Sequence, residues 1–122
     1  MKLTTRPATA EDVARFYPEH SASFRAWVVE MDGEVKAVIG IALYRPVSCL
    51  FSVFDEELRV HLKRPAILRL IKQVESVVKR SRLPVRAVAE PTEPTAPDIL
   101  KRLGFEYLDD IDGDAVYQYG GE

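Results

Sequence analysis

The sequence predicts a protein of the α/β (α+β) class, with a mixed central sheet of about six to seven strands flanked by three helices. Two dipeptides, Asp32-Gly33 and Asp112-Gly113, each separate apolar runs, which is typical of tight turns between antiparallel strands. A long helical pattern separates the apolar runs 49–54 and 85–89, which favours a crossover between parallel strands. Hairpins and a crossover in one chain require a mixed sheet.

Length and composition are those of an ordinary globular protein. The chain has 122 residues, so residues 1–122 are expected to form a single domain. Apolar residues make up 47% of it, which is enough for a core, and the net charge of −2 gives no argument for a nucleic-acid or membrane partner. No run is apolar enough over a sufficient length to cross a bilayer, and the first residues lack a signal-peptide core. A cytoplasmic location is expected.

The N-terminal part predicts a strand, a short helix and a hairpin. Leu3–Arg6 is expected to be a strand, and Thr9 is expected to cap a helix that has acids in its first turn. Phe24–Met31 and Glu34–Tyr44 are the predicted strands of the first hairpin. The second of these contains the segment AVIGIAL, which is apolar at every position and therefore predicts a central strand covered on both faces.

The middle of the chain predicts a buried strand and the longest helix. Cys49–Phe54 is the strand, and its lone cysteine indicates a buried thiol in a reducing compartment. The helix is expected to begin near Pro65, because the first helical position needs no N–H. Glu75 and Lys79 have the spacing of an i,i+4 pair. The predicted apolar stripe consists of Ile67, Leu68, Ile71, Val74 and Val78.

The C-terminal part predicts a strand, a helix and a second hairpin. Val85–Ala89 is the strand, and Ala96–Leu103 is a helix that Thr95 is expected to cap and Gly104 to end. The strands Glu106–Ile111 and Ala115–Tyr119 follow. The predicted order is therefore β-α-β-β-β-α-β-α-β-β.

Charge is distributed unevenly along the chain. Between Arg59 and Arg86 the only acid is Glu75, whereas 106–114 is acidic. The basic segment is either a solvated helix face or an anion-binding face. The acidic segment is a polar hairpin tip, because its glycine comes too early for a calcium loop. His20 is expected to be a surface residue, and no second histidine stands at a metal-ligand spacing, so no metal site is expected.

The turn between the strand 49–54 and the long helix is the main candidate site. A turn that leads from a strand into a helix N-terminus can bind anions, because its free N–H groups and the helix dipole point the same way. A phosphate-binding turn is usually rich in glycine, but this one has none. It carries His61, Lys63, Arg64 and Pro65 instead.

Three motifs in this order resemble the GCN5-related N-acetyltransferase (GNAT) family. LTTRPATAEDV is similar to its first strand and helix, VVEMDGEVKAVIGIAL to its second and third strands, and ILKRLGFEYLDD to its last helix and sixth strand. The resemblance extends from Leu3 to Tyr119 and implies the GNAT fold. A fold does not by itself imply an activity.

The resemblance implies that acetyl-CoA, if it binds, binds at the turn after the fourth strand. The family pattern there is R/Q-x-x-G-x-G/A, whose backbone N–H groups hold the pyrophosphate. Segment 59–64 occupies this pattern, but only Arg59 matches it, and Leu62 and Arg64 replace the glycines. Pro65 removes a donor and disfavours helical geometry at Arg64. The cofactor-binding candidates are Phe54, Arg59, His61, Leu62, Lys63, Arg64, Pro65 and Ala66.

The catalytic features that the resemblance implies are not matched. Leu100 stands where the family often has a general-acid tyrosine, and Glu93 stands where it often has an asparagine. The strand 49–54 has no acid, although Asp55, Glu56 and Glu57 follow it. The short loop 19–23 leaves no room for the family's second helix. Catalytic residues are therefore left unassigned.

Three hypotheses follow for function. The favoured one is an acetyltransferase-like protein with weak or no acyl-CoA-dependent activity, which serves as a structural or interaction module. Its short form resembles phage-encoded acetyltransferase-like proteins, so the virion is an alternative location. The second hypothesis is an active N-acetyltransferase that acts on an amine, and the third is a regulatory anion-binding module. Expected partners are another protein, of a virion or a host, or a second copy of the chain.

Overall fold

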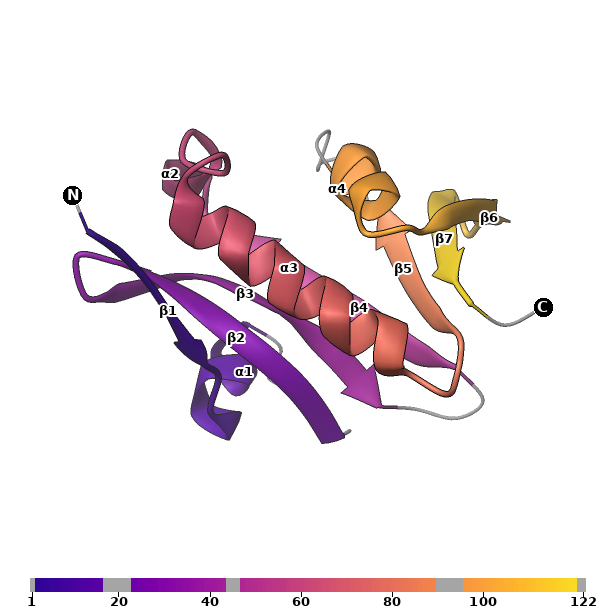
Figure 1. Ribbon diagram of the computed structural model, residues 1–122, viewed down its shortest axis with the longest axis horizontal. Helices are drawn as coiled ribbons and strands as arrows, with labels where there is room; N and C mark the ends of the chain where they lie inside the picture. The colour runs from indigo at the N-terminus through magenta and orange to yellow at the C-terminus, as the bar shows by residue number, and fades with distance from the viewer. Residues whose placement is uncertain (1, 17–22, 44–46, 90–95, 121–122) are drawn as a thin grey trace.

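The computed structural model describes residues 2–16, 23–43, 47–89 and 96–120, in which seven strands form one sheet (Figure 1). The strands lie in the order β1-β2-β3-β4-β5-β7-β6. Neighbouring strands are antiparallel except for β4 and β5, which are parallel. The elements are β1 (Leu3–Pro7), α1 (Ala10–Phe16), β2 (Ser23–Met31), β3 (Glu34–Leu43), β4 (Ser48–Phe54), α2 (Glu56–Arg59), α3 (Pro65–Arg80), β5 (Val85–Ala89), α4 (Ala96–Arg102), β6 (Glu106–Ile111) and β7 (Asp114–Tyr119).

The mixed sheet and the order of its strands along the chain confirm the predicted α+β class. The structure has four helices in its described part and not three, because the turn after β4 contains the short helix α2. Asp32 and Asp112 both adopt positive φ, 50° and 53°, and each is followed by a glycine with positive φ. These are the backbone angles of tight hairpin turns, so both predicted hairpins are confirmed.

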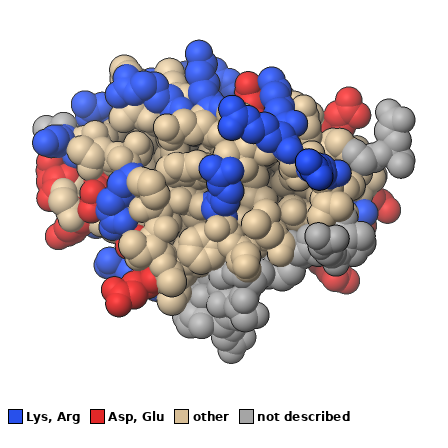
Figure 2. Space-filling view, turned by 60° about the horizontal axis from the view of Figure 1, so that its bottom comes forward, with Lys and Arg blue, Asp and Glu red and all other residues tan. Residues whose placement is uncertain are grey.

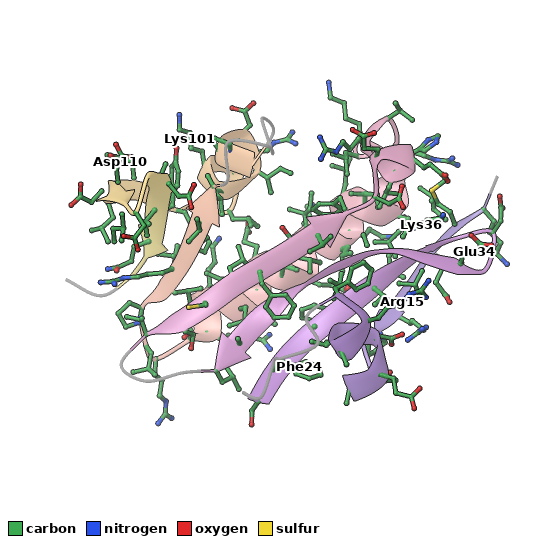
Figure 3. The ribbon with its side chains drawn as sticks, turned by 180° about the vertical axis from the view of Figure 1, so that it is seen from behind. Arg15, Phe24, Glu34, Lys36, Lys101 and Asp110 are labelled. Carbon is green, nitrogen blue, oxygen red and sulfur yellow. The ribbon has the colours of Figure 1, made fainter. Side chains whose placement is uncertain are left out.

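Helices cover the two faces of the sheet unequally (Figures 1 and 3). On one face, α2, α3 and α4 contribute to the main core cluster, with Leu58, Val74 and Leu100 among its buried residues. On the other face, α1 contributes Val13 to a smaller cluster with Val28 and Val38. The sheet is therefore the middle of three layers.

Strand β3 is the central strand that its sequence predicts. Residues 37–42 are all buried, because β2 and β4 flank the strand and core clusters cover both of its faces. Gly40 is required where β3 meets β2. A Cβ at this position would lie 2.4 Å from the Cβ of Ala26 and 2.6 Å from the carbonyl oxygen of Arg25.

Strand β4 is less buried than its sequence predicts. Ser48 is buried, but Cys49 is half-buried and Ser52 is exposed. The expectation of a fully buried strand and a buried thiol is therefore wrong. For Ser52 the reason is that β5 pairs with β4 only from Ser48 to Leu50, so the rest of β4 lacks a neighbour on that side among the described residues.

Helix α3 lies across the main core face with a stripe that differs from the predicted one at a single position. Its buried residues are Ile67, Leu70, Val74 and Val78, and Ile71 packs against the same cluster. Leu68 was predicted to belong to this stripe, but it is 38% exposed. Positions 67, 70, 71, 74 and 78 follow the i, i+3, i+4, i+7 pattern more closely. The predicted pair is confirmed, with Lys79 Nζ 3.1 Å from Glu75 Oε1.

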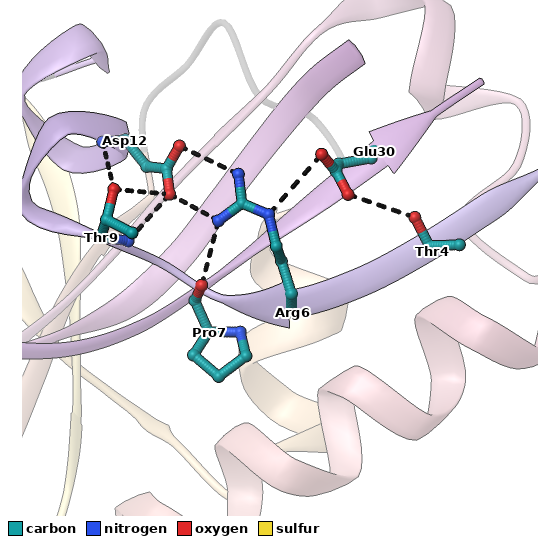
Figure 4. Close-up of polar contacts among 6 residues, drawn as sticks. All are labelled: Thr4, Arg6, Pro7, Thr9, Asp12 and Glu30. Carbon is teal, nitrogen blue, oxygen red and sulfur yellow. Dashed lines mark hydrogen bonds and ion pairs between the residues drawn. The ribbon is translucent and has the colours of Figure 1, made fainter. Parts of the chain in front are cut away.

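A network of polar side chains fixes α1 to the edge of the sheet (Figure 4). Arg6 of β1 donates two hydrogen bonds to Asp12 of α1, at 2.7 and 3.2 Å, and its Nε lies 3.6 Å from Glu30 of β2. Asp12 also accepts hydrogen bonds from the N–H and the hydroxyl of Thr9, and the Thr9 hydroxyl accepts from the Asp12 N–H. This reciprocal arrangement is a capping box, and it confirms Thr9 as the helix cap.

The C-terminal part ends the sheet with an exposed edge strand. Gly104 ends α4 with a φ of 92°, and the N–H of Phe105 donates to the carbonyl of Leu100 at 2.9 Å, which is a helix C-cap. All residues of β6 are exposed, and its pairing with β7 is irregular between Tyr107 and Asp109. Among the described residues, no helix has the length and hydropathy needed to span a membrane.

Candidate functional site

The candidate site begins where β4 and β5 separate. Their recorded partners are Ser48 with Val85, Cys49 with Arg86, and Leu50 with Ala87. Beyond these pairs β4 continues through 51–54 beside β3, while β5 continues beside β7. The two parallel strands therefore diverge in the direction of the turn that follows Phe54, and the backbone of 51–54 lacks a strand partner on one side in the described part of the chain.

The turn itself begins with a helix that was not predicted. Asp55 has an extended conformation, and its carboxylate accepts the N–H of Glu57 at 3.0 Å. Acids follow in the first turn of α2, where they interact favourably with the helix dipole. Leu58 is fully buried in the main core. An aspartate followed by two glutamates and an apolar residue is a recognisable helix start. The sequence therefore contained enough information to predict α2.

Several backbone N–H groups of the turn donate to carbonyls of the same turn. Leu58 donates to the carbonyl of Asp55 at 2.9 Å, His61 donates to Leu58 at 2.9 Å, and Arg64 donates to His61 at 3.0 Å. The N–H of Leu62 makes a longer contact of 3.5 Å with the carbonyl of Arg59. An N–H group that already donates to a carbonyl is not available to a phosphate oxygen, so the turn offers few backbone donors to an anion.

The start of α3 offers few donors as well. Arg64 is its N-cap, with φ −69° and ψ 150° and no side-chain cap, which confirms that the residue before the proline is extended. Its carbonyl accepts the N–H groups of both Ile67 and Leu68, at 3.0 and 3.1 Å. Pro65 has no N–H. Within the described chain, Ala66 is therefore the one residue in the first turn of α3 whose N–H group has no backbone acceptor.

The eight predicted site residues lie along this one turn but face different ways. Phe54 and Leu62 pack against the main core cluster. Ala66 and the side chains of Arg59 and His61 are half-buried, whereas Lys63, Arg64 and Pro65 are exposed. Leu62 replaces a glycine of the family pattern, but the structure directs its side chain to the core and away from a ligand in solvent. The exposed cations, together with His61, are the groups that could meet an anion from solvent.

Nearby acids already have structural roles. Asp55 caps α2, and Glu57 Oε2 lies 3.5 Å from Lys36 Nζ, which also lies 3.4 Å from Glu34 (Figure 3 shows Glu34 and Lys36). The charge of Glu57 is the main cause that raises the pKa of Lys36. All three acids of 55–57 are exposed. None of them is held in a sheltered position of the kind in which a general base is tuned.

The position of the implied general acid is part of the core. Leu100 is 5% exposed and belongs to the main core cluster together with Leu103 and Phe105. An aliphatic side chain cannot donate a proton to a departing thiolate. The residues His20, Tyr44, Glu93 and Thr95 lie outside the described part of the chain, as does most of the segment 19–23 in which no second helix is expected.

Other candidate sites are not assembled by the fold. The part of the chain that the structure describes contains no group of three or more His, Cys, Asp or Glu side chains that could hold a metal ion. Cys49 is half-buried, and burial is the main cause that raises the pKa of its thiol. The acids of 106–114 lie on the exposed hairpin β6–β7. The turn between β4 and α3 therefore remains the candidate site.

Among known proteins, similarity to this chain is found in solved structures and not in sequence. No protein-family model matches the sequence, and no curated protein matches it either. Solved structures do match. The ribosomal-protein-S18-alanine N-acetyltransferase of Escherichia coli is 16% identical, with a TM-score of 0.64, and the match covers 99% of this chain and 97% of that one.

Two further structures contain the cofactor. The PaiA N-acetyltransferase of Thermoplasma acidophilum, in complex with coenzyme A, has a TM-score of 0.66 at 12% identity, covering 97% of this chain and 98% of that one. A GNAT family acetyltransferase of Elizabethkingia anophelis with acetyl-CoA bound has a TM-score of 0.61 at 10% identity, covering 95% and 96%. At such identities the similarity establishes architecture alone. The chain therefore has the fold of the GCN5-related N-acetyltransferases.

Proposed function

We propose that this chain is an acetyltransferase-like protein of GNAT fold with weak or no acyl-CoA-dependent activity, and that it serves as a structural or interaction module. One observation carries the proposal. The N–H groups of Leu58, His61 and Arg64 donate to carbonyls of the same turn. A pyrophosphate that the turn held through its backbone would have to replace these bonds, and each replaced bond would leave a carbonyl without its donor.

Two further features support the proposal. Pro65 removes a donor at the helix start where an anion would be bound. Leu100 is an apolar core residue at the position where the family resemblance implies a general acid. Reduced cofactor binding and a missing proton donor act on separate steps of acyl transfer, so the two changes together lower activity more than either one.

Acetyl-CoA is the ligand to test first, because two neighbours in fold hold coenzyme A or acetyl-CoA. If this chain binds it, we propose that the side chains of His61, Lys63 and Arg64 replace the backbone as the phosphate contacts. The two exposed cations can reach an anion outside the turn without breaking its internal hydrogen bonds. Binding of this kind is strongly weakened by salt. It would favour the alternative function, an active N-acetyltransferase acting on an amine.

Thermal unfolding with and without acetyl-CoA and CoA tests the proposal. A ligand that binds the native state raises its stability, by about 2.7 kcal/mol at about 100 times the dissociation constant. We expect no shift at millimolar ligand. A rise of several degrees that the Lys63→Ala/Arg64→Ala variant abolishes would overturn the proposal. Lys79→Ala/Arg80→Ala is the matched control, because it removes two adjacent exposed cations from the other end of α3.

A further inference from the structure

Two oppositely charged surfaces occupy separate places on this molecule. The basic ridge is the outer face of α3, formed by the exposed residues Arg69, Lys72, Lys79 and Arg80. The acidic hairpin is formed by β6, β7 and their turn, with Glu106, Asp109, Asp110, Asp112 and Asp114 and no Lys or Arg in 106–114. Figure 2 shows Lys and Arg side chains gathered along one edge of the molecule and acids toward its sides.

The two surfaces do not neutralise each other within one molecule. Helix α3 covers the middle of the sheet, whereas β6 is its outermost strand, as the position of Asp110 in Figure 3 shows. Among the described residues no ion pair joins the ridge to the hairpin. Lys79 pairs with Glu75 of its own helix, and Arg69, Lys72 and Arg80 have no ion-pair partner in the described part of the chain.

We propose that a second copy of this chain occupies the ridge, with the acidic hairpin of one molecule lying along α3 of another. The lengths agree. Residues 69–80 of a helix extend for about 16 Å, and the strand Glu106–Ile111 extends for about 17 Å. Acids of the hairpin can therefore meet the cations at both ends of the ridge, Arg69 with Lys72 and Lys79 with Arg80. Contact between like surfaces is excluded, because it would place two basic ridges or two acidic strands against each other.

Apolar side chains contribute to the same contact. On the hairpin Tyr107, Leu108 and Ile111 are 54%, 44% and 44% exposed, and beside the ridge Leu68 is 38% exposed. Leu68, which is exposed although its position predicts a buried residue, would thus be covered by the partner molecule in this contact.

This inference deepens the interaction role proposed above, but it depends on residues that lie away from the turn 55–66. Failure of the association would leave the coenzyme A measurement unaffected, and the reverse also holds. A reciprocal contact gives a closed dimer, and a one-way contact gives longer chains. Both assemblies use the same two surfaces.

Sedimentation velocity from micromolar to millimolar protein concentration tests the contact. We expect association in about 0.01 M salt, where charges act over about 30 Å, and its loss in about 1 M salt, where they act over about 3 Å. Arg69→Glu/Lys72→Glu and Asp109→Lys/Asp110→Lys are each expected to weaken association about tenfold or more, because each places like charges in contact. Lys101→Glu/Arg102→Glu, on the exposed part of α4, is the matched control and should associate like the parent.

A mixture of the two charge-reversed variants provides the decisive measurement. Each variant is expected to stay monomeric alone, whereas the mixture is expected to associate, because every ridge then has an oppositely charged hairpin available. Circular dichroism of each variant verifies that it is folded. A parent protein that is monomeric at every concentration in low salt, or folded variants that fail to associate when mixed, would overturn the proposal.

Discussion

Leu50 of β4 and Ala87 of β5 are the last partners in the parallel pair at the centre of the sheet. Beyond them β4 follows β3 into the turn at Asp55, and β5 follows β7 away from it. The divergence places the start of α3 at an opening between parallel strands, which is a usual location of ligand sites in sheets of this kind. The geometry of a site is therefore present, although several N–H groups of the turn already donate to carbonyls of the same turn.

Replacing Arg64 and Pro65 should make the start of α3 a better anion site and create coenzyme A binding. Arg64→Gly/Pro65→Ala removes a side chain, restores an N–H and allows the close approach of a phosphate. We expect this variant to gain several degrees in melting temperature with saturating CoA, while the parent gains none. Arg80→Gly, at the other end of α3, is the control. An equal response of variant and parent would contradict the role assigned to Arg64 and Pro65.

The capping box of α1 should give a stability that depends on pH. Hydrogen bonds from Arg6, and then from Thr9, hold the pKa of Asp12 well below its usual range. The folded state therefore keeps this carboxylate ionised at pH values where the unfolded chain binds a proton. Its stabilisation is present above about pH 4 and is lost as pH falls through the lowered folded value.

Asp12→Asn measures that contribution. We expect it to lower the free energy of unfolding by about 1 kcal/mol at pH 7, with a smaller difference from the parent at pH 2. Urea unfolding at both pH values gives the comparison. Glu11→Gln, one residue away on the exposed face of α1, should change stability little. A difference between Asp12→Asn and the parent that stays constant down to pH 2 would contradict the lowered pKa.

Adding one methyl group to the centre of the sheet should be costly. In Gly40→Ala the new Cβ meets the Cβ of Ala26 at 2.4 Å and the carbonyl of Arg25 at 2.6 Å. We expect a loss of about 2–3 kcal/mol or more in urea unfolding, because the backbones of β2 and β3 would have to separate. The double variant Ala26→Gly/Gly40→Ala removes the shortest of these contacts, and it should recover part of the loss. Equal stability of Gly40→Ala and the parent would show that the strands separate without cost.

Truncation of a leucine to alanine should destabilise the protein much more at the buried position 100 than at the exposed position 108. Leu100→Ala removes a side chain that is 5% exposed, and we expect it to cost about 2–4 kcal/mol. Leu108→Ala removes the same atoms from a side chain that is 44% exposed, and it should cost about 0.5 kcal/mol or less. Chemical denaturation of both variants tests the assignment. Similar losses would mean that α4 does not hold Leu100 in the core.

The thiol of Cys49 should react slowly at neutral pH. Its half-buried position on β4 raises its pKa, although the nearby charge of Arg86 opposes the effect in part. The thiolate is the reactive form, so alkylation should be slower than that of a free cysteine and should accelerate as pH rises above the usual thiol range. The urea-unfolded chain is the control and should react at the rate of a free thiol. A native rate equal to the unfolded one would contradict the effect of burial.

Sequence patterns predicted the elements well but predicted exposure less well. The strand Val85–Ala89 and the strand Glu106–Ile111 have the predicted bounds, and Pro65 begins α3 as expected. Leu68 and Cys49 were assigned wrongly, because the depth of a side chain depends on elements that come from elsewhere in the chain. The N-cap of α2 at Asp55 could have been recognised, since the residues after it form an acidic first turn and a buried anchor.

The sequence by itself determined the order of the elements, both hairpin turns, the helix that Pro65 begins and the absence of glycine from the candidate turn. These features depend on residues close together in the chain, where backbone preferences and side-chain periodicity act. Only the tertiary structure decided that Leu62 faces the core, that β4 and β5 separate after Leu50 and that the N–H groups of Leu58, His61 and Arg64 donate to carbonyls within the turn. Strand partners and hydrogen-bond acceptors depend on the three-dimensional arrangement of the whole domain, and local sequence does not specify them.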